Sequence, residues 1–315
     1  MKIVVAGASG FLGGRLLASL RSADHEIIRL VRGATGTRPT PEHPPGQTVG
    51  PAPDARQSAR ETEVRWDPDH DELDVEKLRG ADAVINLCGV GVGDRRWTSQ
   101  YKDLIRSSRV RSTGLLAKAC VQVDVPILIN ASGIGYYGSR GNEPIDESAH
   151  AGTSFLAGVC VAWEEATAPA DRAGVRVVHL RTGLVLGHEG GLLPRLVLLT
   201  KLFAGGKLSS GRQYFPWISA TDEIDGIVHL LTADVAGPVN MSGPAPVTNA
   251  EFTKDLGRAL HRPTPWTVPK VALQLVLGGF AEEVVSGQNA LPTALLESGF
   301  IFSHATLPEA LRSEI

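Results

Sequence analysis

Short apolar runs alternate with longer amphipathic segments along residues 1–187. The short runs are rich in Val and Ile, as buried parallel strands are, and they lie at 3–6, 26–31, 83–87, 127–131 and 175–180. Between them, apolar residues recur at helical spacing, which predicts helices at 11–21, 99–121 and 154–173. This alternation is typical of a Rossmann-like, doubly wound parallel α/β sheet.

Two regions depart from the alternation. Residues 33–62 are rich in proline, which disfavours a helix or a central strand, and the prolines are Pro39, Pro41, Pro44, Pro45, Pro51 and Pro53. We interpret this stretch as a surface excursion between the second and third strands, either a functional lid or a loosely held insertion. After Gly187, Gly and Pro breakers separate mixed elements, with helices expected at 249–260 and 271–285. Residues 188–315 are therefore expected to form mainly a smaller C-terminal domain.

Composition narrows the classes of function. The chain has 315 residues, is 43% hydrophobic and carries a net charge of −3, which gives no electrostatic reason to bind nucleic acid or an anionic membrane. The apolar runs are too short to span a bilayer, and Met1 leads directly into a strand-like run, so a cytoplasmic protein is expected. The three cysteines are scattered, which argues against a disulfide framework and against a structural metal site.

A glycine loop follows the first predicted strand and opens the first predicted helix. In Gly7-Ala8-Ser9-Gly10-Phe11-Leu12-Gly13, the first glycine permits a tight turn, the second lets the backbone approach a pyrophosphate, and the third lets helix and strand pack closely. The helix N-terminus then presents unpaired N–H groups to the phosphates. We expect a dinucleotide cofactor here, against the simpler alternative of a structural turn. The expected contacts are Gly7, Ser9, Gly10, Phe11, Leu12 and Gly13.

The end of the second strand favours NADP(H) over NAD(H). An acidic residue there would bind the ribose hydroxyls of NAD, whereas an arginine accommodates a 2′-phosphate. The chain has Arg32 and no Asp or Glu at this point. Arg32 can make charge-assisted hydrogen bonds to a phosphate, although it could also be a solvated arginine at the start of a loop.

Seven further segments, taken together, resemble one group of the extended short-chain dehydrogenases/reductases. They are VINLCG at 84–89, RRWT at 95–98, SSRVRST at 107–113, ASGIGYYG at 131–138, FLAGVCVAWE at 155–164, LRTGLVLG at 180–187 and PVTNAEFT at 246–253. The glycine spacing Gly-x-x-Gly-x-x-Gly agrees with this superfamily. The group is the atypical epimerase family proteins, which are similar to nucleoside-diphosphate-sugar epimerases, and the resemblance covers nearly the whole chain outside the proline-rich stretch.

The resemblance implies an organisation and a cofactor pocket. It implies a Rossmann domain over 1–187, with a returning segment near 215–242, and a smaller, discontinuous C-terminal substrate domain. It also implies that Asp67, Leu87, Cys88 and Gly89 line the adenosine and ribose side of the cofactor. Arg109, where many extended enzymes have an Asn, and Ala131 are further candidate contacts. Four of these residues have an alternative, structural role. Asp67 could begin a turn, Leu87 and Cys88 could be core residues, and Arg109 could face solvent. A homodimer is conceivable, because helices like 99–121 often form dimer surfaces in this superfamily.

The catalytic pair of the superfamily is missing. The resemblance implies a Tyr-x-x-x-Lys pair, in which the lysine lowers the pKa of the tyrosine, together with a serine that polarises the substrate oxygen. Ser132 lies at the serine position and could instead cap its loop. No Tyr-x-x-x-Lys occurs in the sequence. In the helix that should carry it, the tyrosine position is Leu156 or Phe155, and the lysine position is Val159 or Cys160. Tyr136 and Tyr137 are the nearest substitutes as proton donors, unless they pack the loop.

Three functions remain open from the sequence, the third being an enzyme that uses the cofactor as a scaffold or for internal redox in an isomerisation or elimination. The first is an NADP(H)-dependent oxidoreductase or epimerase-like enzyme acting on a sugar-like or carbonyl small molecule. The second is a non-catalytic protein that senses NADP(H), a hypothesis motivated by the missing Tyr-Lys pair.

Overall fold

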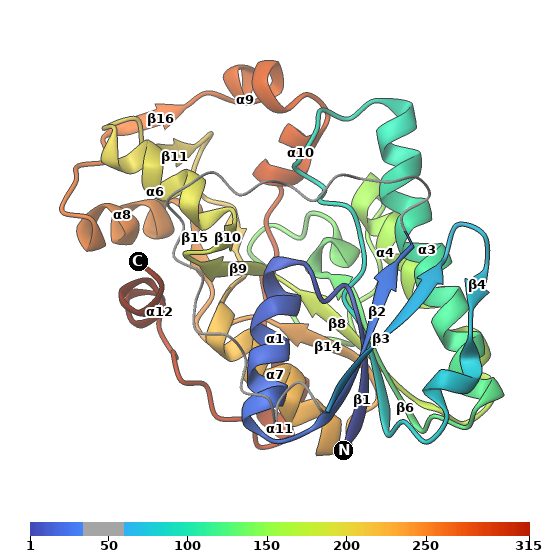
Figure 1. Cartoon of the computed structure of the whole chain (residues 1–315). Helices are drawn as coiled ribbons and strands as arrows, with labels where there is room; N and C mark the ends of the chain where they lie inside the picture. Colours follow the sequence, from blue (N-terminus) through green and yellow to red (C-terminus); the bar gives the residue numbers. More distant parts are fainter. Residues whose placement is uncertain (34–59) are drawn as a thin grey trace, which may run out of the picture.

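The computed structural model describes residues 1–33 and 60–315, and its centre is an eight-stranded sheet (Figure 1). The strand order is β14-β8-β6-β5-β1-β2-β3-β4, and every neighbouring pair is parallel except β3 and β4. The strands are β1 (Lys2–Ala6), β2 (Glu26–Arg32), β3 (Glu61–Asp67), β4 (Glu72–Leu73), β5 (Ala83–Asn86), β6 (Ile127–Gly133), β8 (Arg176–Thr182) and β14 (Gly237–Met241). The order reverses direction at β1, so the prediction of a doubly wound Rossmann-like sheet is confirmed.

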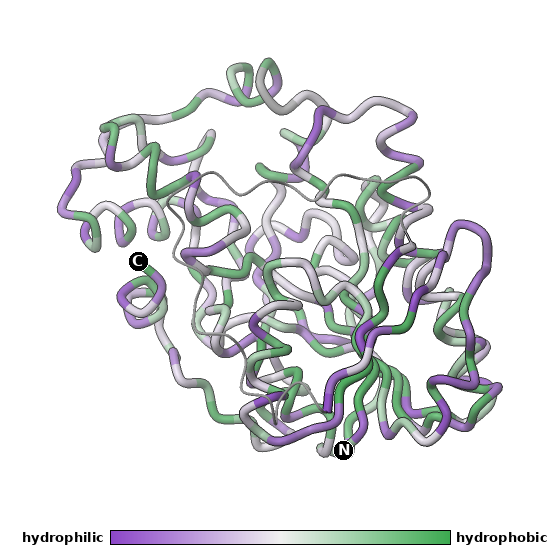
Figure 2. Tube along the Cα trace, in the orientation of Figure 1, coloured by the Kyte–Doolittle hydropathy of each residue, from purple (hydrophilic) through white to green (hydrophobic). Residues whose placement is uncertain are grey.

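Helices cover both faces of this sheet. Successive side chains of a buried strand point to opposite faces, so each central strand contributes to two cores. In β1, Ile3 and Val5 join one core with α1 (Phe11–Ser22) and α7 (Ala220–Thr232). Val4 and Ala6 join the other core with α3 (Ser99–Gln122) and α5 (Ala168–Arg172). Figure 2 shows hydrophobic stretches in the strands at the centre of the sheet, as expected where a sheet is buried on both faces, and polar positions along β2 and β3.

Three predicted boundaries were wrong. The helix predicted over 154–173 is two helices, α4 (Phe155–Glu165) and α5, which ends one turn after Pro169. The helix predicted over 271–285 is interrupted at Gly278, whose φ of 59° ends α9 (Lys270–Leu277) before α10 (Phe280–Val285). The proline-rich stretch does not extend to residue 62, because β3 begins at Glu61. Whether that stretch is a lid or an insertion concerns residues 34–59, which lie outside the described part.

The C-terminal half contributes a second, smaller core and also returns to the main sheet. Trp217, Phe252 and Leu311 are central to the smaller core. The elements of this core and the short strands near it are β9 (Leu184–Gly187), β10 (Gly190–Gly191), α6 (Leu193–Lys201), β11 (Gly206–Leu208), β12 (Tyr214–Phe215), β13 (Trp217–Ser219), β15 (Val247–Thr248), α8 (Asn249–Ala259), β16 (Trp266–Val268) and α12 (Leu307–Glu314). Outside it, β7 (Pro144–Ile145) pairs with β17 (Asn289–Ala290), and α11 (Thr293–Glu297) packs on the core of the large sheet. Two short 3-10 helices, η1 (Val75–Leu78) and η2 (Ile134–Tyr137), complete the described elements. After β13, the chain re-enters the large sheet through α7 and β14, beside β8.

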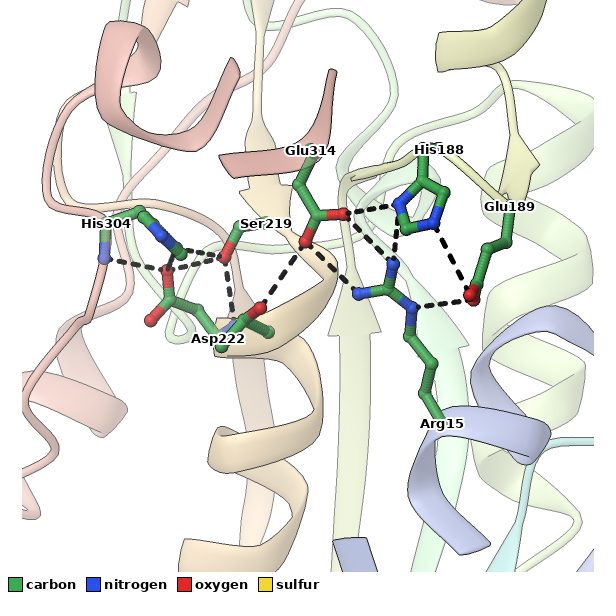
Figure 3. Close-up of polar contacts among 8 residues, drawn as sticks. Arg15, His188, Glu189, Ser219, Asp222, His304 and Glu314 are labelled. Atoms are coloured by element: carbon green, nitrogen blue, oxygen red, sulfur yellow. Dashed lines mark hydrogen bonds and ion pairs between the residues drawn. The ribbon is translucent and has the colours of Figure 1, made fainter. Parts of the chain in front are cut away.

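Two polar clusters fasten the C-terminal segment to the rest of the molecule (Figure 3). Glu314 is 2% exposed and accepts two hydrogen bonds, of 3.2 and 3.0 Å, from Arg15 on α1. Asp222 on α7 accepts from the backbone N–H groups of residues 303 and 304. The last helix is therefore tied directly to the helix that follows the glycine loop.

The second cluster contains a serine, an aspartate and a histidine, but it is not arranged as a hydrolytic triad. Ser219 donates to Asp222 at 2.7 Å and accepts from the backbone N–H of Asp222, which makes it the N-cap of α7. The Nδ1 atom of His304 faces both Ser219 and Asp222, at 3.0 and 3.4 Å, so no histidine relays a proton between them. The cluster is a helix cap that also anchors the chain (Figure 3).

Candidate functional site

Two glycines of the loop are required by the packing of strand, turn and helix. Gly7 has a φ of +83°, and a Cβ there would lie 2.7 Å from the carbonyl carbon of Leu87. A Cβ on Gly13 would lie 2.3 Å from the carbonyl oxygen of Gly7. Any side chain at either position would push the helix away from the sheet. These glycines therefore explain the fold, and by themselves they do not indicate a ligand.

Gly10 is different, because the fold does not require a glycine there. Its φ is −80°, and a Cβ would meet only the carbonyl oxygen of Gly7, at 3.4 Å. Gly10 is the N-cap of α1, yet no side chain caps this helix end, and Ser9 and Gly10 are exposed. An uncapped helix N-terminus, whose backbone N–H groups are accessible, is suited to bind a phosphate. The arrangement thus fits the pyrophosphate of a dinucleotide.

The side chains of the next two loop residues pack within the protein. Phe11 lies against the β9–β10 turn, where a Cβ on Gly190 would meet the ring at 2.7 Å, and Arg15 lies over the same ring. Leu12 packs on the core formed with α1 and α7. Only the backbone N–H groups of these two residues remain as possible phosphate ligands.

The end of β5 runs beside the glycine loop. Leu87 is half-buried against the core, and Cys88 is 7% exposed. Burial raises the pKa of the Cys88 thiol to about 11, so it stays protonated at neutral pH, and the charge of Arg32 acts on it in the opposite direction. Gly89 is exposed. The side chains of Leu87 and Cys88 are therefore part of the core. Their backbone lies next to the glycine loop, and the exposed Gly89 follows it.

Arg32 and Asp67 end the adjacent strands β2 and β3. Arg32 is exposed, as a residue that contacts a 2′-phosphate must be. Both carboxylate oxygens of Asp67 are already used: one accepts from the backbone N–H of Asp69 at 2.9 Å and the other faces Nδ1 of His70 at 2.8 Å. Asp67 therefore begins a turn, as its alternative stated, and its contact with a cofactor stays a prediction.

Ser132 lies near the end of β6, after the half-buried Ala131, and belongs to a buried charged network. Ser132 is 7% exposed, and its hydroxyl donates to Glu164 of α4 at 2.7 Å. Glu164 accepts two further hydrogen bonds, both 2.9 Å, from the guanidinium of Arg181 on β8. Burial opposes the charge of Arg181, but the bonds and the ion pair with Glu164 outweigh it and raise the pKa of Arg181. Ser132 therefore has a strong acceptor and a structural role in this network.

The two tyrosine candidates have different environments. Tyr137 is 0% exposed, donates to Asn240 at 2.7 Å and accepts from Arg181 at 2.9 Å; burial raises its pKa to about 12. Its expected role as a proton donor to substrate is therefore corrected to a packing role. Tyr136 is half-buried, and the guanidinium carbon of Arg181 lies 3.5 Å from its ring centroid. Tyr136 remains the candidate proton donor.

The helix that lacks the Tyr-Lys pair is held by groups that the sequence analysis did not identify. Glu283 of α10 accepts from the backbone N–H of Leu156 and from the Ser154 hydroxyl, both at 3.2 Å, and so supports the N-terminus of α4. Burial raises the pKa of the Cys160 thiol to about 12, so it stays neutral at pH 7. The lysine position falls on Val159 or Cys160, and neither side chain can supply a positive charge. An arginine in a strand that is predicted to be buried, as at position 181, is a signal that could have suggested a buried acidic partner.

Arg109 does not face solvent, which excludes its stated alternative. It is 9% exposed, lies over the ring of Trp163 at 4.8 Å and donates to the carbonyl oxygen of Ile105 at 2.9 Å. A Cβ on Gly89 would lie 3.0 Å from its guanidinium carbon. The guanidinium of Arg109 therefore lies next to Gly89, which follows the carboxyl end of β5 beside the glycine loop.

Residues 1–33 and 60–315 contain neither a membrane-spanning helix nor a cluster of metal ligands. No helix there combines the length and the apolar character needed to cross a membrane. No three or more His, Cys, Asp or Glu side chains gather there in a way that could hold a metal ion.

Known proteins match the chain along its whole length. Residues 3–242 match the NAD dependent epimerase/dehydratase family, and residues 268–314 match a domain of unknown function. An epimerase family protein of Mycobacterium bovis is 44% identical over 98% of this chain and 96% of its own. The crystal structure of human epimerase family protein SDR39U1 with NADPH has a TM-score of 0.82 and 28% identity, and covers 100% of this chain and 99% of its own. A nucleoside-diphosphate sugar epimerase from Corynebacterium glutamicum has a TM-score of 0.73 and 32% identity, and covers 100% of this chain and 58% of its own.

These matches agree with the resemblance inferred from the seven segments and the glycine spacing, and with the Rossmann-like fold. The chain belongs to the NAD dependent epimerase/dehydratase family, among its epimerase family proteins.

Proposed function

We propose that the chain is an NADP(H)-dependent enzyme that reduces the carbonyl group of a small, sugar-like molecule. The proposal depends mainly on the uncapped N-terminus of α1. The fold does not require a glycine at position 10, and the absence of a side chain there leaves the helix N-terminus open. Human SDR39U1, a relative, was crystallised with NADPH, and the Corynebacterium relative is named for nucleoside-diphosphate sugars. The preference for NADP(H) rests on Arg32, because its exposed guanidinium can pair with a 2′-phosphate.

The available side chains favour reduction over removal of a proton from an alcohol. When bound, NADPH supplies the hydride that reaches the carbonyl carbon, and the carbonyl oxygen then needs a proton. A tyrosine without a neighbouring lysine is protonated at neutral pH and can donate that proton. Tyr136 has this role in the proposal. Ser132, held by Glu164, fixes the end of β6 beside it.

One observation favours a second candidate, a non-catalytic protein that binds NADP(H) as a signal. The hydroxyl of Ser132 donates its hydrogen bond to Glu164, and Tyr137 is fully buried. Of the three candidate residues, Tyr136 is then the one left for proton transfer. A protein that only senses the cofactor would bind it without consuming it.

Turnover separates the two candidates. We expect NADPH, rather than NADH, to be oxidised in the presence of at least one member of a panel of aldehydes, ketones and nucleotide-linked keto sugars. Tyr136→Phe should lower kcat by about 100-fold or more, because it removes the proton donor. Ser132→Ala should also lower kcat, through the position of β6. Tyr214→Phe, a half-buried tyrosine of β12, is the control and should retain wild-type kcat. NADPH binding with no oxidation across the panel would favour the sensor, and full activity in Tyr136→Phe would contradict its role.

A further inference from the structure

Several large apolar side chains of the C-terminal half are exposed rather than packed in its core. They lie on α6, on the turn that follows it, on β16 and on α9, and more than half of each residue is exposed. The residues are Leu198, Leu202, Phe203, Trp266, Val271 and Leu275. Leu198 and Leu202 are four positions apart, as are Val271 and Leu275, so each pair lies on one side of its helix.

Contacts between these elements bring the side chains onto one surface. β11 runs parallel to β16, with Gly206 opposite Trp266. The indole N–H of Trp266 donates to the carbonyl oxygen of Phe203 at 2.8 Å, and the guanidinium carbon of Arg262 lies 5.2 Å from the centroid of the Phe203 ring. Figure 1 shows α6, β11 and β16 together, with α9 continuing directly from β16. We call this region the α6–α9 surface.

The segments that form the α6–α9 surface are basic, although the chain as a whole is slightly acidic. Residues 190–212 and 256–281 contain seven Lys and Arg residues and no Asp or Glu, and the seven are Arg195, Lys201, Lys207, Arg212, Arg258, Arg262 and Lys270. Because the whole chain has a net charge of −3, the residues outside these two segments carry −10. Within the part of the chain that the structure describes, Arg258 alone among the seven has an acidic partner, Asp255 at 2.9 Å.

Exposed apolar side chains beside cations without acidic partners suit the surface of a bilayer that contains anionic lipids. Leu, Phe and Trp side chains enter the boundary between the head groups and the acyl chains, while Lys and Arg stay at the phosphates. A second copy of this chain fits the surface less well. A two-fold interface places the same patch on both subunits, so the cations of the two copies would face one another.

We propose that the α6–α9 surface docks the protein on an anionic bilayer. Leu202, Phe203 and Trp266 enter the lipid interface, and Lys201 and Arg262 pair with lipid phosphates. The net charge of the whole chain does not indicate this binding, because the acidic residues elsewhere outweigh the local positive charge. The inference is independent of the cofactor and of the reaction.

Co-sedimentation with lipid vesicles tests the docking. Phosphatidylcholine vesicles that contain about one third phosphatidylglycerol should bind the wild type at least about 10-fold more tightly than vesicles of phosphatidylcholine alone, because only the former carry a net negative charge. NaCl at about 0.5 M should weaken the binding by screening it. Lipids brominated on the acyl chain should quench tryptophan fluorescence in the wild type but much less in Trp266→Phe, which should still bind.

Variants separate the apolar and the electrostatic contributions. Leu198→Ser/Leu202→Ser should weaken binding to the anionic vesicles by about 10-fold, and Lys201→Gln/Arg262→Gln by about 20-fold. Ile301→Ser and Arg172→Gln, which change exposed residues outside the α6–α9 surface, are the matched controls and should bind as the wild type does. Because all these residues are exposed, each variant should keep the wild-type unfolding temperature.

Three results would overturn the proposal. The first is a wild type that binds neither kind of vesicle, and the second is equal binding to both kinds. The third is a dimer, seen by sedimentation velocity, that Leu198→Ser/Leu202→Ser dissociates while vesicle binding is unaffected; this would assign the surface to a second copy of the chain. Failure of NADPH to bind would contradict the proposed function and leave the vesicle measurements unchanged.

Discussion

Replacement of Glu164 by leucine is expected to lower the free energy of unfolding by about 3–5 kcal/mol, because it leaves a buried charge without its partner. The side chain of Arg181 is 4% exposed, and Glu164 accepts from both its Nε and its Nη2. The same substitution removes the acceptor of the Ser132 hydroxyl. The guanidinium cannot reach water without rearranging Tyr136 and Tyr137, which it contacts.

Urea unfolding measures this loss. Glu165→Leu is the matched control, because Glu165 is the next residue of α4 and is exposed; it should change the free energy of unfolding by no more than about 0.5 kcal/mol. Adding Arg181→Met to Glu164→Leu should restore most of the stability, since no unpaired charge then remains. Equal stability of Glu164→Leu and the wild type would show that the pair is not a determinant of the fold.

Glu223→Gln is expected to remove a pH dependence of stability between about pH 4.5 and 8. Glu223 is 0% exposed, accepts from the Thr182 hydroxyl at 2.8 Å, and has no partner for its second carboxylate oxygen among the described residues. Burial raises its pKa from 4.5 to about 8, and the bond from Thr182 only partly opposes this. The native protein therefore keeps a proton that the unfolded chain loses above its own, lower pKa.

The sign follows from this difference in bound protons. Between the unfolded and the folded pKa, the native state binds more protons, so this group's contribution to stability falls by about 1.4 kcal/mol per pH unit as pH rises. Glutamine resembles the protonated carboxyl and does not titrate. The variant should match the wild type near pH 4.5 and exceed it by several kcal/mol at pH 8.

Thermal and urea unfolding from pH 4.5 to 8.5 gives the comparison. Glu297→Gln, at an exposed position of α11, is the control and should follow the wild-type curve. If the difference in free energy of unfolding between Glu223→Gln and the wild type does not grow with pH, Glu223 is not held protonated in the folded protein.

The parts of the fold predicted from the sequence are those determined by local patterns. The strand β1, the glycine loop and α1 follow directly in the chain, and each has its own periodicity or turn chemistry. The broken helices were missed because the apolar periodicity continues across Ala166 and Thr167, where α4 ends before α5 begins, and across Gly278. The start of β3 was missed because Glu61 and Thr62 extend a strand at a partly polar edge of the sheet.

The site was predictable only where one segment forms it. The glycine loop is such a segment. The pairing of Glu164 with Arg181, and the contact of Glu283 with the N-terminus of α4, join elements far apart in the chain. Likewise, nothing local indicates that Arg109 is buried and Arg106 exposed, since both lie on one helix and only its packing against α4 distinguishes them.

The measurement that tests the account most directly is the affinity of Gly10→Trp for NADPH. The indole would fill the space in front of the uncapped end of α1, and Gly10 has no backbone strain and few neighbours that would prevent folding. Gly14→Ala, an exposed glycine of the same helix with open space around it, is the control. We predict that Gly10→Trp folds normally and binds NADPH at least about 100-fold more weakly, while Gly14→Ala binds it like the wild type. Unchanged NADPH affinity in Gly10→Trp would contradict the account, because the phosphates would then lie elsewhere.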